Sequence, residues 1–308
     1  MTSVNSPKSR VYPKRKLCPK AWPKNLKNLE KRAERFISKR MSTAVALSSS
    51  TAWYDSPLYY DMVYEDYTKR ETRFLHAVVK QYGKDFAESW KILEPACGSG
   101  RLLESLAQHG HTVHGFDRNR NQVAYAKKRL NKLSAKTKVW QDSLQDFKIK
   151  KAGSYDLTHC FVTTFKYLLK EKDAVASLRL MSDALRPGGL CLIGLHLTNY
   201  KDNPADYEKW VNRRDGVRVL SETWSEPAKI KQRTEAMRTR MTITEKGNTR
   251  VEETLWDFRT YSAAELKSLL VKIKTLELVA CHDFHYSIRQ KRKLNDAYTD
   301  IILVLRRK

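Results

Sequence analysis

The regular alternation of short apolar segments with amphipathic segments between residues 91 and 197 constrains the fold of this chain most strongly. The apolar segments have the length and composition of buried strands, and the segments between them place apolar residues at helical spacing. Strands joined by helices normally form a parallel sheet with helices on both faces. We therefore predict a doubly wound α/β fold. The expected strands are 91–95, 112–117, 138–140, 155–162 and 190–197, and the expected helices are 101–109, 119–133 and 172–185.

The pattern changes after residue 197 and predicts a small antiparallel β insert over about residues 199–260. Three strands are expected at 217–223, 233–244 and 249–259, and Lys246-Gly-Asn248 has the composition of a hairpin turn. Ser262 followed by Glu265 forms a capping-box pattern, which predicts a helix running to about residue 272. Strands at 276–281 and 300–305 then close the domain, which we expect to span residues 53–308.

Residues 1–52 have the composition of a basic, mobile tail and linker. The first 40 residues contain 13 basic residues and only two acids, Glu30 and Glu34, in a chain of net charge +25. A short helix over 25–41 is expected within them. The tail is either a solvated extension or an arm that binds nucleic acid or an anionic surface. Met41 is an alternative start of the protein.

The glycine-rich segment between the first strand and the first helix predicts a ligand site. Gly98 and Gly100 permit left-handed backbone and the close approach of a ligand. In an open parallel sheet, this turn lies at the carboxyl edge, where ligands bind. A dinucleotide site would need a third glycine where Leu103 stands, and Glu94 would repel a pyrophosphate. A cationic ligand fits this segment better.

This segment resembles motif I of the class I S-adenosylmethionine (SAM)-dependent methyltransferases. The matching residues are Glu94, Ala96, Cys97, Gly98 and Gly100, and the resemblance extends in order over roughly residues 55–308. It implies a Rossmann-like seven-stranded sheet with an antiparallel last strand, and SAM as the cofactor. The chemistry of SAM agrees with this assignment. SAM carries a sulfonium cation and an uncharged ribose, and carboxylates can accept hydrogen bonds from the two ribose hydroxyls.

The resemblance also assigns cofactor contacts outside the glycine loop. Asp117 ends the second strand, where the family binds both ribose hydroxyls, and Asp142 and Ser143 lie where the adenine is bound. Phe161 ends the strand that runs past the methyl donor. The segment around Tyr60 resembles the lid, which implies a ring near the sulfonium. The alternative is that Tyr60 and its neighbouring tyrosines only pack the lid helix.

The acceptor is constrained mainly by missing motifs. The chain lacks the Asp/Asn-Pro-Pro-Tyr/Phe motif of amino-methylating enzymes and the Pro-Cys nucleophile of base-C5 enzymes, so Cys160 is expected to be a core thiol. The passage containing Arg259 and Tyr261 resembles the acceptor-covering insert of small-molecule methyltransferases. His196 ends the fifth strand and is a further candidate for acceptor contact. Because methyl transfer mainly needs alignment of the reactants, no catalytic residue is assigned.

These observations predict an enzyme, a SAM-dependent methyltransferase that acts on a small molecule. The alternatives are an RNA or other polyanion methyltransferase and a non-catalytic SAM-binding module. Five cysteines without a CxxC pair favour a reducing compartment, so we expect a cytoplasmic protein without a membrane span. No metal is expected, because the clustered residues His109, His111 and His114 lie on a turn and a strand without convergent geometry.

Overall fold

A computed structural model describes residues 46–47, 53–133 and 136–308. The expected helix at 25–41, Met41 and almost all of the basic tail lie outside the described residues. Within the described part of the chain, no helix is long and apolar enough to cross a membrane.

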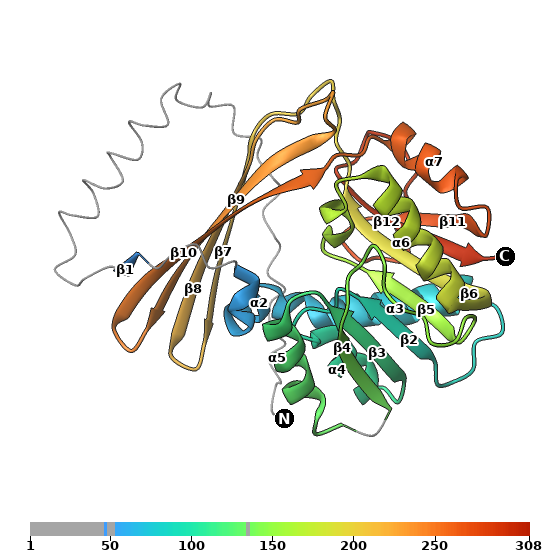
Figure 1. The fold of residues 1–308 in the computed structure, drawn as a ribbon, viewed down its shortest axis with the longest axis horizontal. Helices are drawn as coiled ribbons and strands as arrows, with labels where there is room; N and C mark the ends of the chain where they lie inside the picture. Colours follow the sequence, from blue (N-terminus) through green and yellow to red (C-terminus); the bar gives the residue numbers. More distant parts are fainter. Residues whose placement is uncertain (1–45, 48–52, 134–135) are drawn as a thin grey trace, which may run out of the picture. The chain divides into compact units, whose positions relative to one another are not determined.

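A seven-stranded sheet forms the centre of the described domain (Figure 1). Its spatial order is β11-β12-β6-β5-β2-β3-β4, and β12 runs antiparallel to both of its neighbours while the other pairings are parallel. The predicted doubly wound sheet with one reversed strand is therefore confirmed. The strands are β2 (Lys91–Pro95), β3 (Thr112–Asp117), β4 (Thr137–Gln141), β5 (Tyr155–Cys160), β6 (Leu185–His196), β11 (Leu276–His282) and β12 (Asp300–Arg307).

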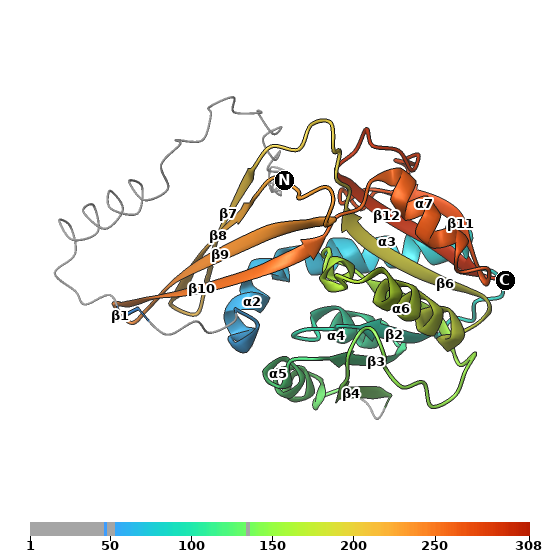
Figure 2. The same cartoon turned by 45° about the horizontal axis from the view of Figure 1, so that its top comes forward.

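Helices cover both faces of this sheet, as Figures 1 and 2 show. The apolar sides of α3 (Thr68–Tyr82) and α4 (Arg101–Gln108) pack with one set of alternating strand residues, including Ile92. α6 (Glu171–Ala184) and α7 (Ala263–Val271) pack with the other set. The period of two along each strand thus divides the core into two layers.

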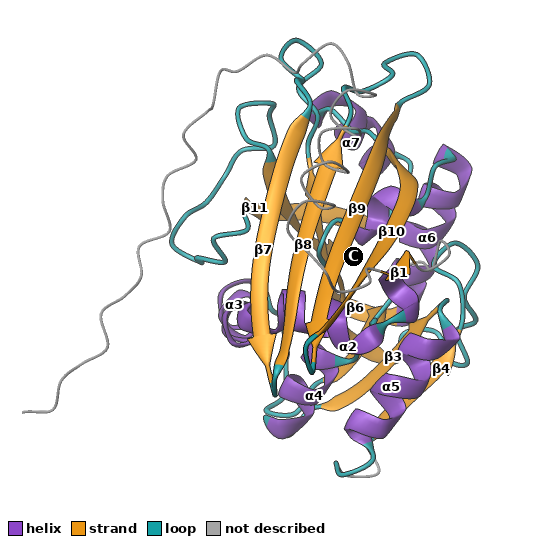
Figure 3. Ribbon diagram, turned by 90° about the vertical axis from the view of Figure 1, so that its left-hand side faces the viewer, coloured by secondary structure: helices purple, strands orange, loops and turns teal. Residues whose placement is uncertain are grey.

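The residues after β6 form most of a second, five-stranded sheet, which Figure 3 shows face on. Its order is β1-β10-β9-β8-β7, and the hairpin predicted at Lys246–Asn248 joins β9 to β10. Two of its strands were not predicted. β7 is a charged edge strand without a clear apolar period, and β1 pairs with β10 in a segment expected to be linker. The strands are β1 (Ala46–Leu47), β7 (Asp206–Arg214), β8 (Val217–Ser225), β9 (Thr234–Glu245) and β10 (Asn248–Arg259).

The N-terminal helix α2 (Pro57–Tyr64) connects the two sheets. With the 3₁₀ helix η1 (Trp53–Asp55), it packs its apolar side on the inner face of the five-stranded sheet. The same helix contacts α5 (Arg120–Leu130), which follows β3 of the seven-stranded sheet. The packing of η1 and α2 on the five-stranded sheet is formed by the buried residues Trp53, Tyr59, Met62, Val63, Val217, Val219, Met241 and Ile243.

The clustered histidines have separate partners. His109 donates to the Ser105 carbonyl oxygen, and His114 bonds to the Tyr155 hydroxyl. The Trp90 amide donates to Nδ1 of His111 at 3.2 Å, so Nε2 of His111 carries the hydrogen and faces Nε2 of His76 at 3.0 Å. Protonation would break this arrangement, and burial and the neighbouring histidines lower the pKa of His111 to about 4.

The fold should therefore lose stability in mild acid partly through His111. In the unfolded chain its pKa is about 6.5, so between that value and about 4 the unfolded state binds more protons. The free energy of unfolding should fall as pH falls through this window, by about 1–2 kcal/mol from His111 alone. Urea unfolding of the wild type and His111→Gln at about pH 7 and pH 5 measures this contribution. Equal pH dependence in both proteins would contradict it.

Candidate functional site

The glycine loop between β2 and α4 adopts a left-handed backbone at three positions. Ala96, Gly98 and Gly100 have φ values of 55°, 53° and 73°. The loop folds back onto β3, because the Cys97 amide donates to the Phe116 carbonyl oxygen at 2.8 Å. Gly115 makes this approach possible, since a Cβ there would lie 2.9 Å from the Cys97 Cβ. The loop is thus held at the carboxyl edge of the sheet.

Asp117 at the end of β3 holds this loop through its carboxylate. Its Oδ2 accepts the Gly98 amide at 2.9 Å, and its Oδ1 accepts the Asn119 amide at 2.8 Å. Burial raises the pKa of Asp117 above its usual value, although the backbone amides of Asn119, Gly98 and Arg118 favour the charged form. A carboxylate has about four acceptor sites, so acceptor capacity remains for a ligand.

Tyr60 on α2 covers the glycine loop. Its ring lies 3.5 Å from the point where a Cβ on Gly98 would stand. Tyr60 also packs against Tyr54 and Tyr64, with ring centroids 5.1 and 4.9 Å away. The Tyr60 ring thus lies over the glycine loop and also packs within the lid segment, and its contact with a sulfonium stays a prediction.

A buried ion-pair cluster centred on Asp61 was missed by sequence reasoning. The Ser99 hydroxyl donates to Oδ1 of Asp61 at 2.6 Å, and Arg129 on α5 donates to both carboxylate oxygens at 2.8 and 2.7 Å. Arg214 on β7 reaches Oδ2 at 3.2 Å. Burial opposes ionisation, yet these donors hold the pKa of Asp61 below its usual value. One carboxylate thus joins the lid, the glycine loop, α5 and the insert.

Asp142 and Ser143 follow β4 next to Asp117, as predicted. The Asp142 amide donates to the Asp117 carbonyl oxygen at 3.2 Å. The Asp142 carboxylate is largely engaged within its own turn, where it accepts the Ser143 amide at 2.9 Å, the Lys148 amide and the Trp140 indole. These bonds fix the turn and leave limited acceptor capacity for a ligand.

The segment after β5 combines buried residues with left-handed backbone. Phe161 is buried in the core cluster on the α3 side, and Val162 and Thr163 have φ values of 54° and 61°. A left-handed β-branched residue is costly, and such strain is found preferentially at functional sites. Tyr167 lies a few residues further, and its hydroxyl forms a short hydrogen bond with the Tyr54 hydroxyl of the lid segment. The expected core thiol Cys160 is buried.

A second pair of side chains lies beneath the glycine loop. Glu94 on β2 and His159 on β5 are both buried, and His159 Nδ1 stands 3.9 Å from Glu94 Oε1. Within the described residues, Glu94 Oε2 and both ring nitrogens of His159 lack a hydrogen-bond partner. The sequence motif pointed to Glu94 but gave no signal for His159.

The three predicted acceptor residues differ in exposure and in their partners. His196 ends β6 with Nδ1 2.7 Å from Asp300 Oδ1, and its side chain is 39% exposed. Arg259 is buried and donates to the Leu169 carbonyl oxygen at 2.7 Å and to Glu171 at 3.1 Å. Tyr261 is fully buried in the core on the α6 side. Arg259 and Tyr261 therefore attach β10 to the segment after β5.

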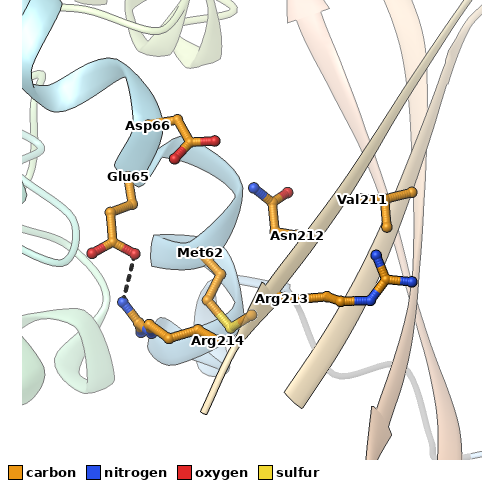
Figure 4. Close-up of a pocket in the computed structure, with 7 residues that line it drawn as sticks. All are labelled: Met62, Glu65, Asp66, Val211, Asn212, Arg213 and Arg214. Carbon is orange, nitrogen blue, oxygen red and sulfur yellow. Dashed lines mark hydrogen bonds and ion pairs between the residues drawn. The ribbon is translucent and has the colours of Figure 1, made fainter. Parts of the chain in front are cut away.

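Figure 4 shows a pocket of about 150 Å³ at the junction of the lid and β7. Arg214 projects into it and donates to Glu65 at 2.8 Å. Because no lining residue belongs to the glycine loop or to the segment after β5, this pocket is separate from the predicted cofactor edge. The lining residues are Met62, Glu65, Asp66, Val211, Asn212, Arg213 and Arg214.

The residues at the carboxyl edge fit a nucleoside that carries an amino-acid end. Asp117 keeps acceptor capacity for a ribose diol, and Glu94 offers a cation a buried oxygen that has no hydrogen-bond partner among the described residues. The left-handed backbone at Gly98 and Gly100 leaves the loop free of side chains that would block a ligand.

Comparisons with known proteins agree with this geometry. Residues 92–189 match the family model described as a methyltransferase domain. The ubiquinone biosynthesis O-methyltransferase of Vibrio parahaemolyticus is 30% identical over 152 residues, which cover 43% of this chain and 62% of that protein. The chain spans about half to three-fifths of the length of the curated relatives that it matches first.

Two solved structures have the same fold at low sequence identity. The sugar N-methyltransferase KedS8 from Streptoalloteichus sp. ATCC 53650 has a TM-score of 0.64 and 19% identity, covering 87% of this chain and 98% of its own. A SAM-dependent methyltransferase from Clostridium acetobutylicum has a TM-score of 0.64 and 15% identity, covering 83% of this chain and 99% of its own.

The Asp61 cluster should contribute strongly to stability. Asp61→Asn removes the charge that compensates Arg129 and Arg214, and a broken buried ion pair costs about 3 kcal/mol. Urea unfolding measures the loss. Asp66→Asn is the matched control, because Asp66 is an exposed acid a few residues further along the chain. Equal stability of the two variants would show that Asp61 does not hold these segments together.

Proposed function

We propose that the class I SAM-dependent methyltransferase domain of this chain transfers a methyl group from SAM to a small-molecule acceptor. The observation that carries the cofactor half of this proposal is the Asp117 carboxylate, which holds the Gly98 and Asn119 amides and keeps acceptor capacity for a ligand. The match of residues 92–189 to a methyltransferase domain and the sheet order support it.

In this proposal, each part of the cofactor has its own residues. Asp117 accepts the ribose hydroxyls, and the turn formed by Asp142 and Ser143 borders the adenine. Glu94 and the backbone of the glycine loop hold the methionyl end. When bound, SAM supplies an electrophilic methyl group on a sulfonium. The Tyr60 ring over Gly98 stabilises positive charge there by cation–π attraction of about 0.5–2 kcal/mol.

The acceptor half of the proposal depends on aromatic side chains beside the glycine loop. They come from the lid, the segment after β5 and the insert, and their rings pack at centroid distances of 4.9 to 6.3 Å. A wall built from three segments at the cofactor edge suits a small acceptor with an apolar or cationic face. The rings are those of Trp53, Tyr54, Tyr60, Tyr64, Tyr167 and Trp256.

Side chains near the acceptor mainly orient it and contribute less to its deprotonation. Burial raises the pKa of Tyr54 and Tyr167 well above the usual tyrosine value, so both hydroxyls stay protonated and act as hydrogen-bond partners. At the end of β6, Asp300 holds Nδ1 of His196, which leaves Nε2 to contact an acceptor proton. Positioning of this kind is sufficient for an in-line methyl transfer.

Asp117→Ala should weaken binding of S-adenosylhomocysteine (SAH), the product form of the cofactor. Loss of two charge-assisted acceptor positions corresponds to about 2–4 kcal/mol, or roughly 30- to 1000-fold in affinity. Isothermal titration calorimetry measures this change. Asp146→Ala, an exposed acid in the next loop, should bind SAH like the wild type. Unchanged affinity in Asp117→Ala would place the ribose elsewhere.

Turnover tests the acceptor class directly. The full chain is incubated with SAM and separate panels of amino sugars, phenols and RNA, and mass spectrometry detects products heavier by one CH₂ unit. The amino sugars offer nitrogen acceptors on a sugar, in line with the name sugar N-methyltransferase, and the phenols offer hydroxyl acceptors for O-methyl transfer. Methylation in a small-molecule panel is the expected result. Methylation of RNA alone would replace this proposal with a polyanion methyltransferase, consistent with the net charge of +25.

A further inference from the structure

Glu94 and His159 form a buried polar pair that lacks the contacts such groups normally make. They lie on neighbouring parallel strands, where Leu93 of β2 is in register with Thr158 of β5. Glu94 is 8% exposed and His159 is fully buried. The 3.9 Å between His159 Nδ1 and Glu94 Oε1 exceeds hydrogen-bond distance. A buried carboxylate oxygen and a buried imidazole without partners are rare and need a physical explanation.

The cation whose charge acts on Glu94, Arg101, is already paired with another carboxylate. Arg101 at the start of α4 donates to Glu71 of α3 through a short ion pair, and Tyr286 also donates to Glu71 at 2.8 Å. Asp117 on β3 adds a second negative charge on the other side of Glu94. The cationic influence of Arg101 is thus opposed by two carboxylates.

The thiols around Glu94 supply no compensating charge. Cys97 in the glycine loop and Cys160 on β5 are buried thiols, and burial raises the pKa of each above its usual value. Burial, Glu71 and Asp117 together raise the pKa of Glu94 well above the usual range against the influence of Arg101. Burial and the charge of Arg101 lower the pKa of His159 to about 3, so its ring is neutral.

We propose that Glu94 carries a proton in the cofactor-free protein and releases it to solvent when the ammonium group of SAM or SAH binds beside the glycine loop. The O–H bond of the carboxyl breaks, and the carboxylate left behind pairs with the incoming ammonium. His159 remains neutral and acts as a positioning residue, which donates its Nδ1–H to Oε1 once that oxygen is charged. This inference rests on the proposed function, because it needs a ligand with an ammonium end.

Two consequences follow for binding. Cofactor binding should release close to one proton per site at neutral pH. Affinity should weaken as pH falls, by up to about tenfold per pH unit, because protons then compete with the ammonium for Glu94. A SAM site whose acid is already charged before binding would show neither effect.

Calorimetry in several buffers measures this proton directly. SAH is titrated into the full chain near neutral pH in buffers with different ionisation enthalpies, and the slope of the observed enthalpy gives the number of protons released. We expect close to one for the wild type and close to zero for Glu94→Gln. The affinity of Glu94→Gln should be nearly independent of pH and should approach that of the wild type in acid. Methylthioadenosine, which lacks the amino-acid end, should release no proton from the wild type.

Variants of His159 test its positioning role. His159→Leu removes the Nδ1 donor and should weaken SAH binding about tenfold while moving proton release to higher pH. His159→Asn keeps a donor near the same position and should restore most of both effects. A merely structural histidine would lower the melting temperature in both variants and leave the proton number unchanged, which would remove His159 from the proposal.

The outcomes separate this inference from the proposed function. SAH binding to the wild type without proton release, or equal proton release from Glu94→Gln, overturns the inference and leaves the methyltransferase proposal intact. If SAH does not bind the wild type at all, the proposed function fails and this inference fails with it.

Discussion

The hydrogen bond from the Gly98 amide to the Asp117 carboxylate is the contact on which the candidate site depends. It joins the loop after β2 to the end of β3, two segments that only a parallel sheet brings to the same edge. The carboxylate fixes the loop by accepting the Gly98 amide, and it retains hydrogen-bond acceptor capacity for a ligand. The fold and the site are therefore specified by the same residues.

The lid and the insert depend on a second carboxylate, that of Asp61. It binds Ser99 in the glycine loop, Arg129 on α5 and Arg214 on β7. Ser99 and Arg129 follow strands of the seven-stranded sheet, and Arg214 lies on the five-stranded sheet, so a displacement of the five-stranded sheet would strain the glycine loop. The insert is thus connected to the glycine loop through Asp61.

Much of the central fold could be predicted from the sequence, because buried parallel strands and amphipathic helices have clear periods. The glycine loop, Asp117 and the capping box at Ser262 were predictable for the same reason, since local chemistry fixes them. β7 was missed because an edge strand in contact with solvent carries charged residues. The roles of Asp61 and His159 were not predictable, because their partners are distant in sequence. The motif that suggested Arg259 and Tyr261 as acceptor contacts gave no sign that both side chains are buried, and their contact with an acceptor stays a prediction.

A crystal structure of the full chain with SAH tests the central claim most directly. The account predicts that both ribose hydroxyls lie within hydrogen-bond distance of the Asp117 carboxylate, about 2.5–3.0 Å, with the amino-acid end against the glycine loop and Glu94. A nucleoside bound away from Asp117, or a dinucleotide pyrophosphate seated on the loop in its place, would contradict it.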